Sequence, residues 1–466
     1  MAKPHVLIIP YPSQGHVIPA MELARRLVND RVKVTFVNTE VIQKVVTRNW
    51  VEKDGCEDLM KMVSIPDGLE PWEDRNEHGK VNQAILESMP SKLEELIMTI
   101  NEEDDNKITC VIADCWISWS LGVAKKMGIR RATFCPASTA TLAIMMSIQK
   151  LIDDGFIDKN GTPQNSGMIR LAETMPPIKP ETLIWTSLHD STSVEVHFQN
   201  CVKQLQDSKL AKWFICNSAV ELEPAAFSLF PQLLPVGPLL ASSRLANQEG
   251  HFWQEDLSCL AWLDQQPVYS VIYIAFGSFT DFNQTQFKEL ALGLELSNKP
   301  FLWVVRPGMT KESTTSYPDG YMDRVGSRGR IVSWAPQQKV LAHPSIACFM
   351  SHCGWNSTLE GVTNGLPFLC WPYFCDQYYN ESYICDIWKT GLGFDKDETG
   401  VITREEIKGK VEQLLSDTTF KCKALDIKET LANSVREGGR SHKNLTKFIE
   451  WIQAGEAKVN DQNDFV

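Results

Sequence analysis

Residues 334–377 read WAPQQKVLAHPSIACFMSHCGWNSTLEGVTNGLPFLCWPYFCDQ, a segment that combines two apolar runs with many polar and aromatic side chains. Ile346–Met350 is a short apolar run that predicts a buried strand, and Ser351–Gly354 is the turn after it. A helix is predicted to begin near Trp355, and Pro367–Cys370 is predicted to form a second strand. This order is typical of an open α/β sheet, in which ligands bind beyond the carboxyl ends of the strands.

The start of the predicted helix is suited to bind an anion. Asn356 and Ser357 lie in its first turn, and Glu360 lies one turn further on. A helix N-terminus offers unpaired N–H donors and a partial positive charge. Backbone amides, a hydroxyl and a side-chain amide therefore point to one place, and we expect phosphate to bind there.

Two further groups of residues flank this helix start. Trp334 and Gln337 precede the first strand, and Asp376 and Gln377 follow the second. An aromatic face, a phosphate site and a carboxylate beside an amide correspond to the base, the pyrophosphate and the sugar of a nucleotide sugar. The alternative is that the tryptophans of this segment are core residues and that the carboxylate only caps a helix.

The whole segment resembles, without a gap, the signature segment of plant UDP-dependent glycosyltransferases of secondary metabolism, the family 1 glycosyltransferases. The resemblance implies that Trp334 stacks on uracil and that Gln337 and Glu360 hold the ribose. It implies that His352, Asn356 and Ser357 hold the phosphates and that Trp355, Asp376 and Gln377 line the sugar. The complete set expected to bind the donor is Gly277, Ser278, Trp334, Ala335, Gln337, His352, Trp355, Asn356, Ser357, Glu360, Asp376 and Gln377.

Composition limits the classes of partner. A chain of 466 residues with 43% hydrophobic content predicts two domains with sizeable cores. Its formal net charge of −12, without a sustained basic run, argues against nucleic acid and anionic membrane surfaces as partners. The thirteen cysteines are scattered without metal-binding spacing, so we expect free thiols. No apolar stretch is long enough for a transmembrane or signal segment, and we expect a cytoplasmic monomer.

Strand and helix patterns alternate along the chain, which predicts parallel sheets. We expect an acceptor-binding domain at residues 1–240, a linker at 241–255 and a donor-binding domain at 256–440. The resemblance implies that a C-terminal helix in 441–466 packs back on the first domain. The expected fold is therefore α/β, with two facing doubly wound Rossmann-like domains and a cleft between them, which is the GT-B fold.

The catalytic groups are expected in the first domain. The first predicted strand, His5–Ile9, ends in a loop with two prolines and a glycine, after which His16 opens a helix. A histidine has a suitable pKa to accept a proton near neutral pH. Asp114, at the end of another predicted strand, is the candidate to orient its ring, a pairing that the resemblance also implies. On position alone, His16 could be a cap or core residue and Asp114 a helix cap.

Several other chemistries lack their motifs. The chain has no nucleophile elbow, no Walker A sequence and no GxGxxG. Asp395 and Asp397 have the DxD spacing of metal-dependent glycosyltransferases, but they sit in a charged stretch that is most simply a solvated turn. We therefore expect no metal and no cofactor, with UDP-glucose as a co-substrate. The predicted reaction is a single displacement that inverts the anomeric centre.

The acceptor is the part that the sequence defines least. The resemblance implies a small apolar molecule with a hydroxyl group, such as a flavonoid, a phenolic, a terpenoid or a hormone. In the family, glutamine at the last position of the signature segment goes with UDP-glucose. A nucleotide-sugar-binding protein without turnover, and an enzyme that uses another UDP-sugar, are the alternatives. The side chains considered for the acceptor pocket are Gln14, Trp116, Met145, Met146, Trp185, Phe198 and Phe374.

Overall fold

The computed structural model describes residues 4–48, 59–102, 106–188, 192–239, 255–310 and 317–454. Their contacts divide the chain into two compact units. Among the described residues, unit 1 contains 4–239 and 433–454, and unit 2 contains 255–432. The linker expected at 241–255 lies outside the described residues, except for Glu255.

In its described part, unit 1 is built on a parallel sheet of seven strands in the order β3-β2-β1-β4-β5-β6-β7. The strands are β1 (His5–Ile9), β2 (Lys33–Thr39), β3 (Met60–Ile65), β4 (Cys110–Asp114), β5 (Arg130–Cys135), β6 (Trp213–Cys216) and β7 (Leu233–Pro235). The helices are α1 (Gln14–Asn29), α2 (Glu40–Arg48), α3 (His78–Asn101), η2 (Cys115–Ile117), α4 (Trp119–Lys126), α5 (Thr139–Met146), α6 (Ile148–Asp153), η3 (Pro180–Thr182), α7 (Val194–Ser208), α8 (Pro224–Leu229) and α17 (Arg440–Gln453).

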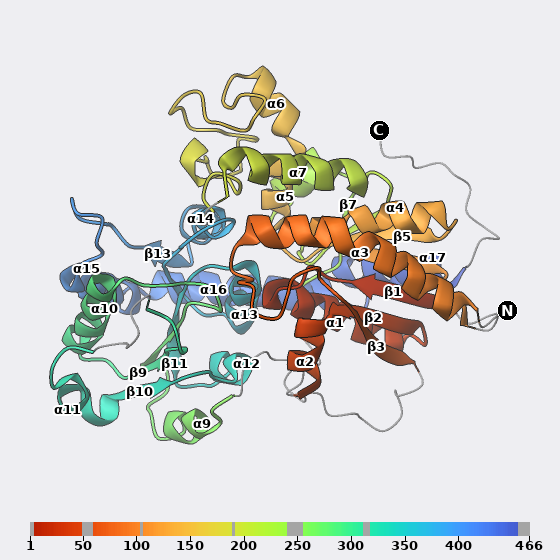
Figure 1. The fold of residues 1–466 in the computed structure, drawn as a ribbon. Helices are drawn as coiled ribbons and strands as arrows, with labels where there is room; N and C mark the ends of the chain where they lie inside the picture. The colour runs from red at the N-terminus through yellow and green to blue at the C-terminus, as the bar shows by residue number, and fades with distance from the viewer. Residues whose placement is uncertain are drawn as a thin grey trace. The chain divides into compact units, whose positions relative to one another are not determined.

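Strand β1 is apolar on both faces because helices cover both sides of the sheet. Val6 and Ile8 belong to a core that includes residues of α1 and α17. Leu7 and Ile9 belong to a second core, formed with α3 and α4. Alternate side chains of a strand point to opposite faces, so a continuous apolar run is what a doubly covered strand requires. Figure 1 shows α1 and α3 on opposite sides of β1.

The last helix, α17, belongs to unit 1 through its apolar side. Phe448 and Ile452 are buried in the same core as β1, and the Arg130 guanidinium lies 4.0 Å from the ring centre of Trp451. The division between the units falls at Asn433, inside α16, whereas the sequence placed it after residue 440. The Ser434 hydroxyl, on the unit 1 side of this division, donates to Glu221 of the same unit at 3.0 Å.

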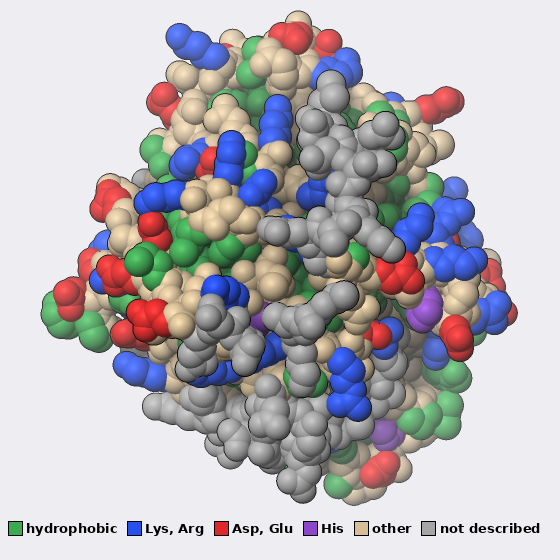
Figure 2. Space-filling model, turned by 90° about the vertical axis from the view of Figure 1, so that its right-hand side faces the viewer, with side chains coloured by type: hydrophobic (Ala, Val, Ile, Leu, Met, Phe, Trp, Pro, Cys, Tyr) green, Lys and Arg blue, Asp and Glu red, His purple; other side chains and the backbone are tan. Residues whose placement is uncertain are grey.

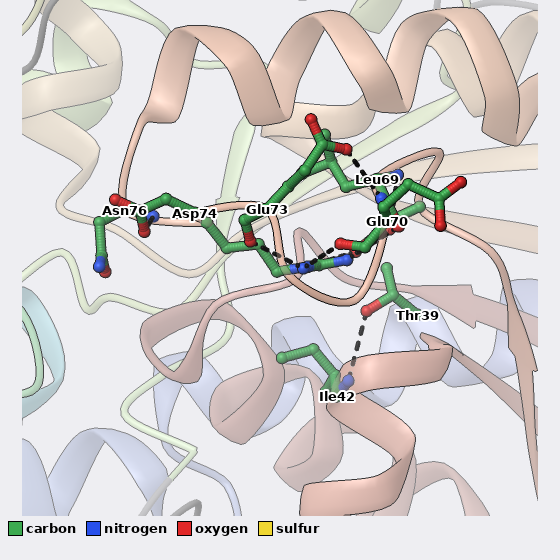
Figure 3. A network of polar contacts seen from close by, with 9 residues as sticks. Thr39, Ile42, Leu69, Glu70, Glu73, Asp74 and Asn76 are labelled. Carbon is green, nitrogen blue, oxygen red and sulfur yellow. Dashed lines mark hydrogen bonds and ion pairs between the residues drawn. The ribbon is translucent and has the colours of Figure 1, made fainter.

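A structured loop follows β3. The Glu70 amide donates to the Glu73 carboxylate at 2.8 Å, and the Asn76 amide donates to Asp74 at 2.9 Å, as Figure 3 shows. The Arg75 guanidinium donates to both oxygens of Asp67 and to three backbone carbonyls of the loop. One planar group therefore fixes the loop, which is a task for which arginine is suited.

Unit 2, in its described part, contains a second parallel sheet, with six strands in the order β10-β9-β8-β11-β12-β13. The strands are β8 (Val271–Ala275), β9 (Phe301–Val304), β10 (Gly329–Val332), β11 (Ile346–Ser351), β12 (Phe368–Cys370) and β13 (Gly391–Gly393). The helices are α9 (Ser258–Leu263), α10 (Gln284–Ser297), α11 (Tyr321–Val325), η5 (Gly326–Arg328), α12 (Gln337–Leu341), α13 (Trp355–Asn364), α14 (Gln377–Ser382), the π-helix η6 (Tyr383–Ile387), α15 (Arg404–Ser416) and α16 (Thr418–Val435).

Both faces of this second sheet are also covered. Ile272 and Ile274 pack in a core with residues of α10 and α15. On the other face, the rings of Tyr273 and Phe349 stack with centroids 5.2 Å apart. Helix α13 lies so close to this face that a Cβ on Gly361 would be 2.2 Å from the Phe368 ring. Two parallel sheets with helices on both faces confirm the predicted α/β, Rossmann-like class.

Surface and cysteine chemistry add three observations. Acidic and basic side chains are interspersed over the face drawn in Figure 2. None of the helices in the described ranges combines the length and apolarity that crossing a bilayer would need. Within the same ranges, the cysteines are thiols rather than disulfides. The last observation confirms the predicted free thiols for that part of the chain.

Candidate active site

Each sheet has one point at which the strand order reverses, and the candidate residues follow the strands at these two points. In unit 1 the reversal lies between β1 and β4, which pair with Ile9 beside Ala113. In unit 2 it lies between β8 and β11, which pair with Ala275 beside Ser351. Ligands of such sheets bind beyond the carboxyl ends of the strands at these positions. The fold alone therefore selects one edge of each unit.

At the edge of unit 1, His16 and Asp114 form a direct hydrogen bond. His16 Nδ1 donates to Asp114 Oδ2 at 2.7 Å, so the ring lone pair belongs to Nε2. The other carboxylate oxygen, Oδ1, accepts from the Trp116 amide at 2.9 Å. Asp114 is buried, whereas 19% of the His16 side chain is exposed. A buried carboxylate thus orients a ring that solvent or a ligand can reach.

At the edge of unit 2, β11 leads into α13 through a tight turn. Cys353 has a φ of 64°, in the left-handed region that non-glycine residues rarely adopt, and Gly354 is the N-cap of α13. Asn356 and Ser357 lie in the first turn, where backbone N–H groups have no helical acceptor. Backbone strain of this kind often occurs at ligand-binding turns. The turn therefore has the features of an anion site.

The His352 ring lies between two glycines. A Cβ on Gly277, which has a φ of 69°, would be 2.6 Å from His352 Nε2, and one on Gly354 would be 2.5 Å from it. Desolvation lowers the pKa of His352 to about 4, although a hydrogen bond with the Ala275 backbone acts in the opposite direction. The ring is therefore neutral near pH 7, and its single N–H can be donated either to the Ala275 carbonyl or to a phosphate. Ser278 follows Gly277 in the same loop.

Next to the helix start, two glutamines bracket one carboxylate. Gln337 Nε2 donates to Glu360 Oε2 at 2.5 Å and to the Ser357 hydroxyl at 3.0 Å. Gln338 Nε2 donates to Glu360 Oε1 at 2.9 Å. The Tyr273 hydroxyl donates to Gln337 Oε1 at 3.1 Å, and burial raises the pKa of this tyrosine well above its ordinary value, so it remains a donor. The network holds a carboxylate that can accept hydrogen bonds from a diol.

Trp334 and Ala335 lie just before this network. Trp334 is half-buried, and its carbonyl oxygen accepts from the Asp256 amide at 2.9 Å. Ala335 is buried. Trp355, the first residue of α13, is also buried, with its ring centre 6.4 Å from that of Trp388. Trp355 therefore has the surroundings of a core residue, whereas Trp334 has a partly exposed side chain.

The loop after β12 brings the last predicted pair into place. Gln377 Oε1 accepts from the amides of Tyr373 and Phe374 at 2.8 and 3.2 Å. These bonds fix the orientation of the Gln377 amide, so its other side is the donor Nε2. Asp376 is half-buried at the start of α14, and its Oδ2 accepts from Asn380 at 2.9 Å. The pair therefore combines a carboxylate acceptor with an amide donor.

The residues considered for the acceptor pocket differ in their surroundings. Trp116, Met146 and Phe374 are half-buried, and Gln14 is the first residue of α1. Met145 is 4% exposed, while Phe198 and Trp185 are each 1% exposed and contact each other edge to face. Core packing leaves almost no surface on these three side chains for an acceptor.

The DxD sequence forms a turn. The Asp397 carboxylate accepts from the amides of Thr399 and Val401, each at 2.9 Å, and Asp395 is paired with Lys410 at 3.1 Å. In the ranges that the structure describes, no group of three or more histidine, cysteine or acidic side chains is arranged to hold a metal ion. The Asp397 carboxylate therefore stabilises its own loop, and the Asp395 carboxylate pairs with helix α15.

Three contributors escaped the sequence analysis. Tyr273 sits in the apolar strand VIYIA and has the pattern of a core residue. Gln338 follows Gln337 directly, and nothing in the sequence indicated that both side-chain amides donate to Glu360. Asn380 lies beyond the end of the signature segment. A buried amide one helical turn after Asp376 is a signal that could have identified Asn380, because side chains four residues apart share a helix face.

The fold and the site together define an enzyme that handles a nucleotide sugar. A family model for UDP-glucuronosyl and UDP-glucosyl transferases matches residues 223–431. The chain is 43% identical to UDP-glycosyltransferase 83A1 of Arabidopsis thaliana over 97% of this chain and 98% of that protein. The chain therefore belongs to the UDP-glycosyltransferase family. It is a glycosyltransferase that takes its sugar from a UDP-sugar.

Solved structures agree with this assignment. The chain superimposes with a TM-score of 0.83 on a UDP-glucosyltransferase from Polygonum tinctorium capable of glucosylating indoxyl, at 26% identity over 98% of this chain and 100% of that one. It superimposes with a TM-score of 0.79 on Phytolacca americana UGT2 complexed with UDP-2-fluoroglucose and pterostilbene, at 25% identity over 97% and 99%. These matches confirm the GT-B fold of UDP-dependent glycosyltransferases.

Proposed function

We propose that the protein is an inverting UDP-glucosyltransferase that glucosylates a hydroxyl group of a small apolar acceptor. The observation that carries this proposal is the hydrogen bond between His16 and the buried Asp114. A histidine that is oriented through Nδ1 and accessible at its ring edge is equipped to act as a general base. The site also resembles that of the family in which this pairing is expected.

The proposed reaction is a single displacement. His16 Nε2 takes the proton from the acceptor hydroxyl, and the acceptor oxygen forms a bond to the anomeric carbon. The bond from that carbon to the diphosphate breaks, and UDP leaves with the electron pair. The α-linked donor thus gives a β-glucoside. Asp114 stabilises the imidazolium that forms and keeps the ring in the productive tautomer.

The phosphate charge is met by groups on unit 2. The N–H groups at the start of α13, the neutral His352 ring and the loop at Gly277 and Ser278 are the proposed donors to the diphosphate. The proposed reaction needs no divalent ion because these donors take over its role. Glu360, held by its two glutamines, is the proposed ligand of the ribose, and Trp334 is the proposed stacking surface for uracil.

Glucose is the proposed sugar. Asp376 can accept from one hydroxyl while Gln377 donates to the next, so the pair is suited to adjacent equatorial hydroxyls. A sugar with one hydroxyl inverted leaves a buried polar group without a partner, which costs about 1–3 kcal/mol. The structure of the Phytolacca protein was obtained with a fluorinated UDP-glucose, which is consistent with this choice.

A small, planar or compact apolar alcohol or phenol is the proposed acceptor. Pterostilbene and indoxyl, the molecules named for the two solved relatives, belong to this class. Trp116 and Met146 are the half-buried apolar side chains of unit 1 that we propose as contacts. Plant secondary metabolism supplies such acceptors, and we propose that the enzyme acts there.

The test is a product analysis with competing donors. The full chain is incubated with a panel of phenols and terpenoid alcohols and equal amounts of UDP-glucose, UDP-galactose and UDP-glucuronate, with excess chelator. We expect a β-glucoside as the main product, identified by mass and by the anomeric proton coupling in NMR. An α-linked product would contradict the inverting mechanism. Equal or better transfer from UDP-galactose would contradict the choice of glucose. Activity that returns only with Mg²⁺ or Mn²⁺ would contradict a reaction without a metal ion.

A further inference from the structure

Asn380 connects the two loops that form the sugar and phosphate parts of the donor site. Its Nδ2 donates to the Cys353 carbonyl oxygen at 2.9 Å and to Asp376 Oδ2 at 2.9 Å. Cys353 directly precedes the N-cap of α13, and Asp376 starts α14. One amide group therefore joins the turn that receives the diphosphate to the carboxylate that receives the sugar.

The orientation of this amide is determined by its surroundings. Both neighbours of Nδ2 are oxygen acceptors, so the flipped amide would place an oxygen against two oxygens. Asn380 is fully buried, and its Oδ1 has no hydrogen-bond partner among the described residues. A buried, unpartnered carbonyl is unfavourable, and its retention calls for a specific explanation.

The backbone around Asn380 is fixed as well. Its amide donates to the Asp376 carbonyl at 2.9 Å, which closes the first turn of α14, and α14 continues directly into the π-helix η6. The two joined loops each contain a non-glycine residue with positive φ, Cys353 at 64° and Cys375 at 58°. Such conformations persist when contacts around them hold the backbone. Asn380 provides one of these contacts to each loop.

We infer that Asn380 is a positioning residue for donor specificity, acting through Asp376. The inference rests on the proposed function, in which Asp376 binds a sugar hydroxyl. The hydrogen bond to Oδ2 orients the Asp376 carboxylate, and the hydrogen bond to the Cys353 carbonyl sets its place relative to the phosphate turn. The sugar is then held at a set angle to the diphosphate, as displacement at the anomeric carbon requires.

The role predicts a particular pattern of loss. Asn380→Ala removes no group that is proposed to touch UDP, but it releases the Cys353 carbonyl of the phosphate turn. We therefore expect the affinity for UDP itself to fall by about threefold at most, less than the loss in sugar transfer. The kcat/KM for UDP-glucose should fall about tenfold to a hundredfold, and the preference for UDP-glucose over UDP-galactose should shrink. Ser382→Ala, near the end of the same helix, removes only a hydrogen bond to the Tyr378 carbonyl and serves as the matched control.

A second variant separates positioning from a general structural role. Asn380→Asp keeps the shape but places a second carboxylate beside Asp376. Two adjacent carboxylates raise the pKa of one of them, and the protonated form regains a donor. The activity of Asn380→Asp relative to the unchanged enzyme should therefore rise as the pH is lowered from 8 to 6. Urea unfolding of the variant at pH 8 and pH 6 accompanies this profile, because a role in folding alone would make the activity follow the folded fraction.

The decisive measurement is a double-mutant cycle of Asn380→Ala and Asp376→Ala, read as kcat/KM for UDP-glucose and as the Kd of UDP by calorimetry. If Asn380 acts through Asp376, its removal costs less than about threefold once Asp376 is gone. Full additivity of the two losses, or an Asn380→Ala variant with normal kcat/KM, overturns the inference. Normal glucose transfer by Asp376→Ala alone instead rejects the proposed sugar site, so the two failures can be told apart.

Discussion

Asp114 uses its two carboxylate oxygens for two different donors, the His16 ring and the Trp116 amide. An asparagine at this position has only one acceptor oxygen. If that oxygen serves the Trp116 amide, an NH₂ group faces His16 and forces Nδ1 to become the acceptor. The proton then sits on Nε2, where the acceptor hydroxyl needs a base. Replacing one carboxylate oxygen with an NH₂ group thus inverts the tautomer of the ring.

We therefore predict that Asp114→Asn loses nearly as much turnover as His16→Ala, on the order of a hundredfold or more in kcat/KM. The Kd of UDP should stay unchanged in both variants because UDP is proposed to bind to unit 2. His343, paired with Asp264 at 3.1 Å on unit 2, offers a matched control, and His343→Ala should retain turnover. Steady-state kinetics and calorimetry measure both quantities. Near-normal turnover of His16→Ala at neutral pH would reject the general-base assignment.

Gln377 is the residue on which the donor prediction depends. Its Oε1 holds the amides of Tyr373 and Phe374, two bonds that a neutral imidazole nitrogen with one lone pair cannot both replace. Gln377→His should therefore lower kcat/KM for UDP-glucose about tenfold or more. Gln265→His, at an exposed position of the same unit, is the control. Unchanged transfer of glucose by Gln377→His in a competition with UDP-galactose would rule out this reading.

At the scale of elements, the loops around His352 depend on two glycines. The ring has backbone on both sides, since a Cβ on Gly354 would lie 2.5 Å from Nε2 and one on Gly277 would lie 2.6 Å from it. The φ of Gly354 is −59°, so an alanine suffers no backbone strain there and the contact alone is tested.

We predict that Gly354→Ala weakens UDP binding at least about tenfold, because the ring must move away from the phosphate turn. Gly409→Ala is the matched control, since a Cβ on Gly409 meets nothing within 4 Å in the middle of α15. That variant should bind UDP normally and be slightly more stable, as alanine favours the helix. Titration calorimetry on both variants makes the comparison, and equal affinities would show that His352 does not contribute to the phosphate site.

The sequence predicts those helices and strands in which the pattern of apolar residues matches the burial of their side chains. Strand β1 has the predicted bounds, His5–Ile9, because it is a continuous apolar run that helices cover on both faces of the sheet. Strand β13, Gly391–Gly393, could not be found this way. A Cβ on Gly391 would lie 2.7 Å from the Phe368 carbonyl and from Ile384, so close packing there excludes the side chains that mark a strand.

Helix α7 shows a second reason for a missed element. Its buried side includes the polar residues His197, Gln204 and Ser208. Gln204 accepts from the Ser118 amide at 2.8 Å, so part of this helix face is held by hydrogen bonds. Hydrophobic periodicity does not detect such a face. For a related reason, the signature segment predicted side chains that face a ligand but not Asn380, whose side-chain hydrogen bonds go to Cys353 and Asp376 of the protein itself.

At the scale of the whole molecule, each unit contains a desolvated histidine. Burial lowers the pKa of His5 in unit 1 to about 4, against an opposing hydrogen bond between Nδ1 and the Asn106 carbonyl; nearby Lys33 and Lys61 lower it further. The pKa of His352 in unit 2 is lowered to about 4 by desolvation. Both rings are neutral in the folded chain at pH values at which exposed histidines are half protonated.

The sign of the pH dependence follows from proton binding. Above roughly pH 7.5 the two rings are neutral in both the folded and the unfolded chain, and they contribute no pH dependence. Between pH 6.5 and 4 the unfolded chain binds protons that the folded chain does not, so the free energy of unfolding falls as the pH falls. Two such groups give a loss on the order of a few kcal/mol by pH 4.

We therefore predict that the chain loses stability steadily from pH 7 to pH 4.5, a range above the pKa of ordinary carboxylates. Urea unfolding at a series of pH values measures this loss. His5→Gln removes the titrating group of unit 1, so the free energy of unfolding of this variant should depend less steeply on pH over the same range, whatever its absolute stability. A free energy that stays constant from pH 7 to 5, or an equal slope in His5→Gln, would contradict the role of the buried rings. The slope that remains in His5→Gln reports His352 together with the other titrating groups of the chain.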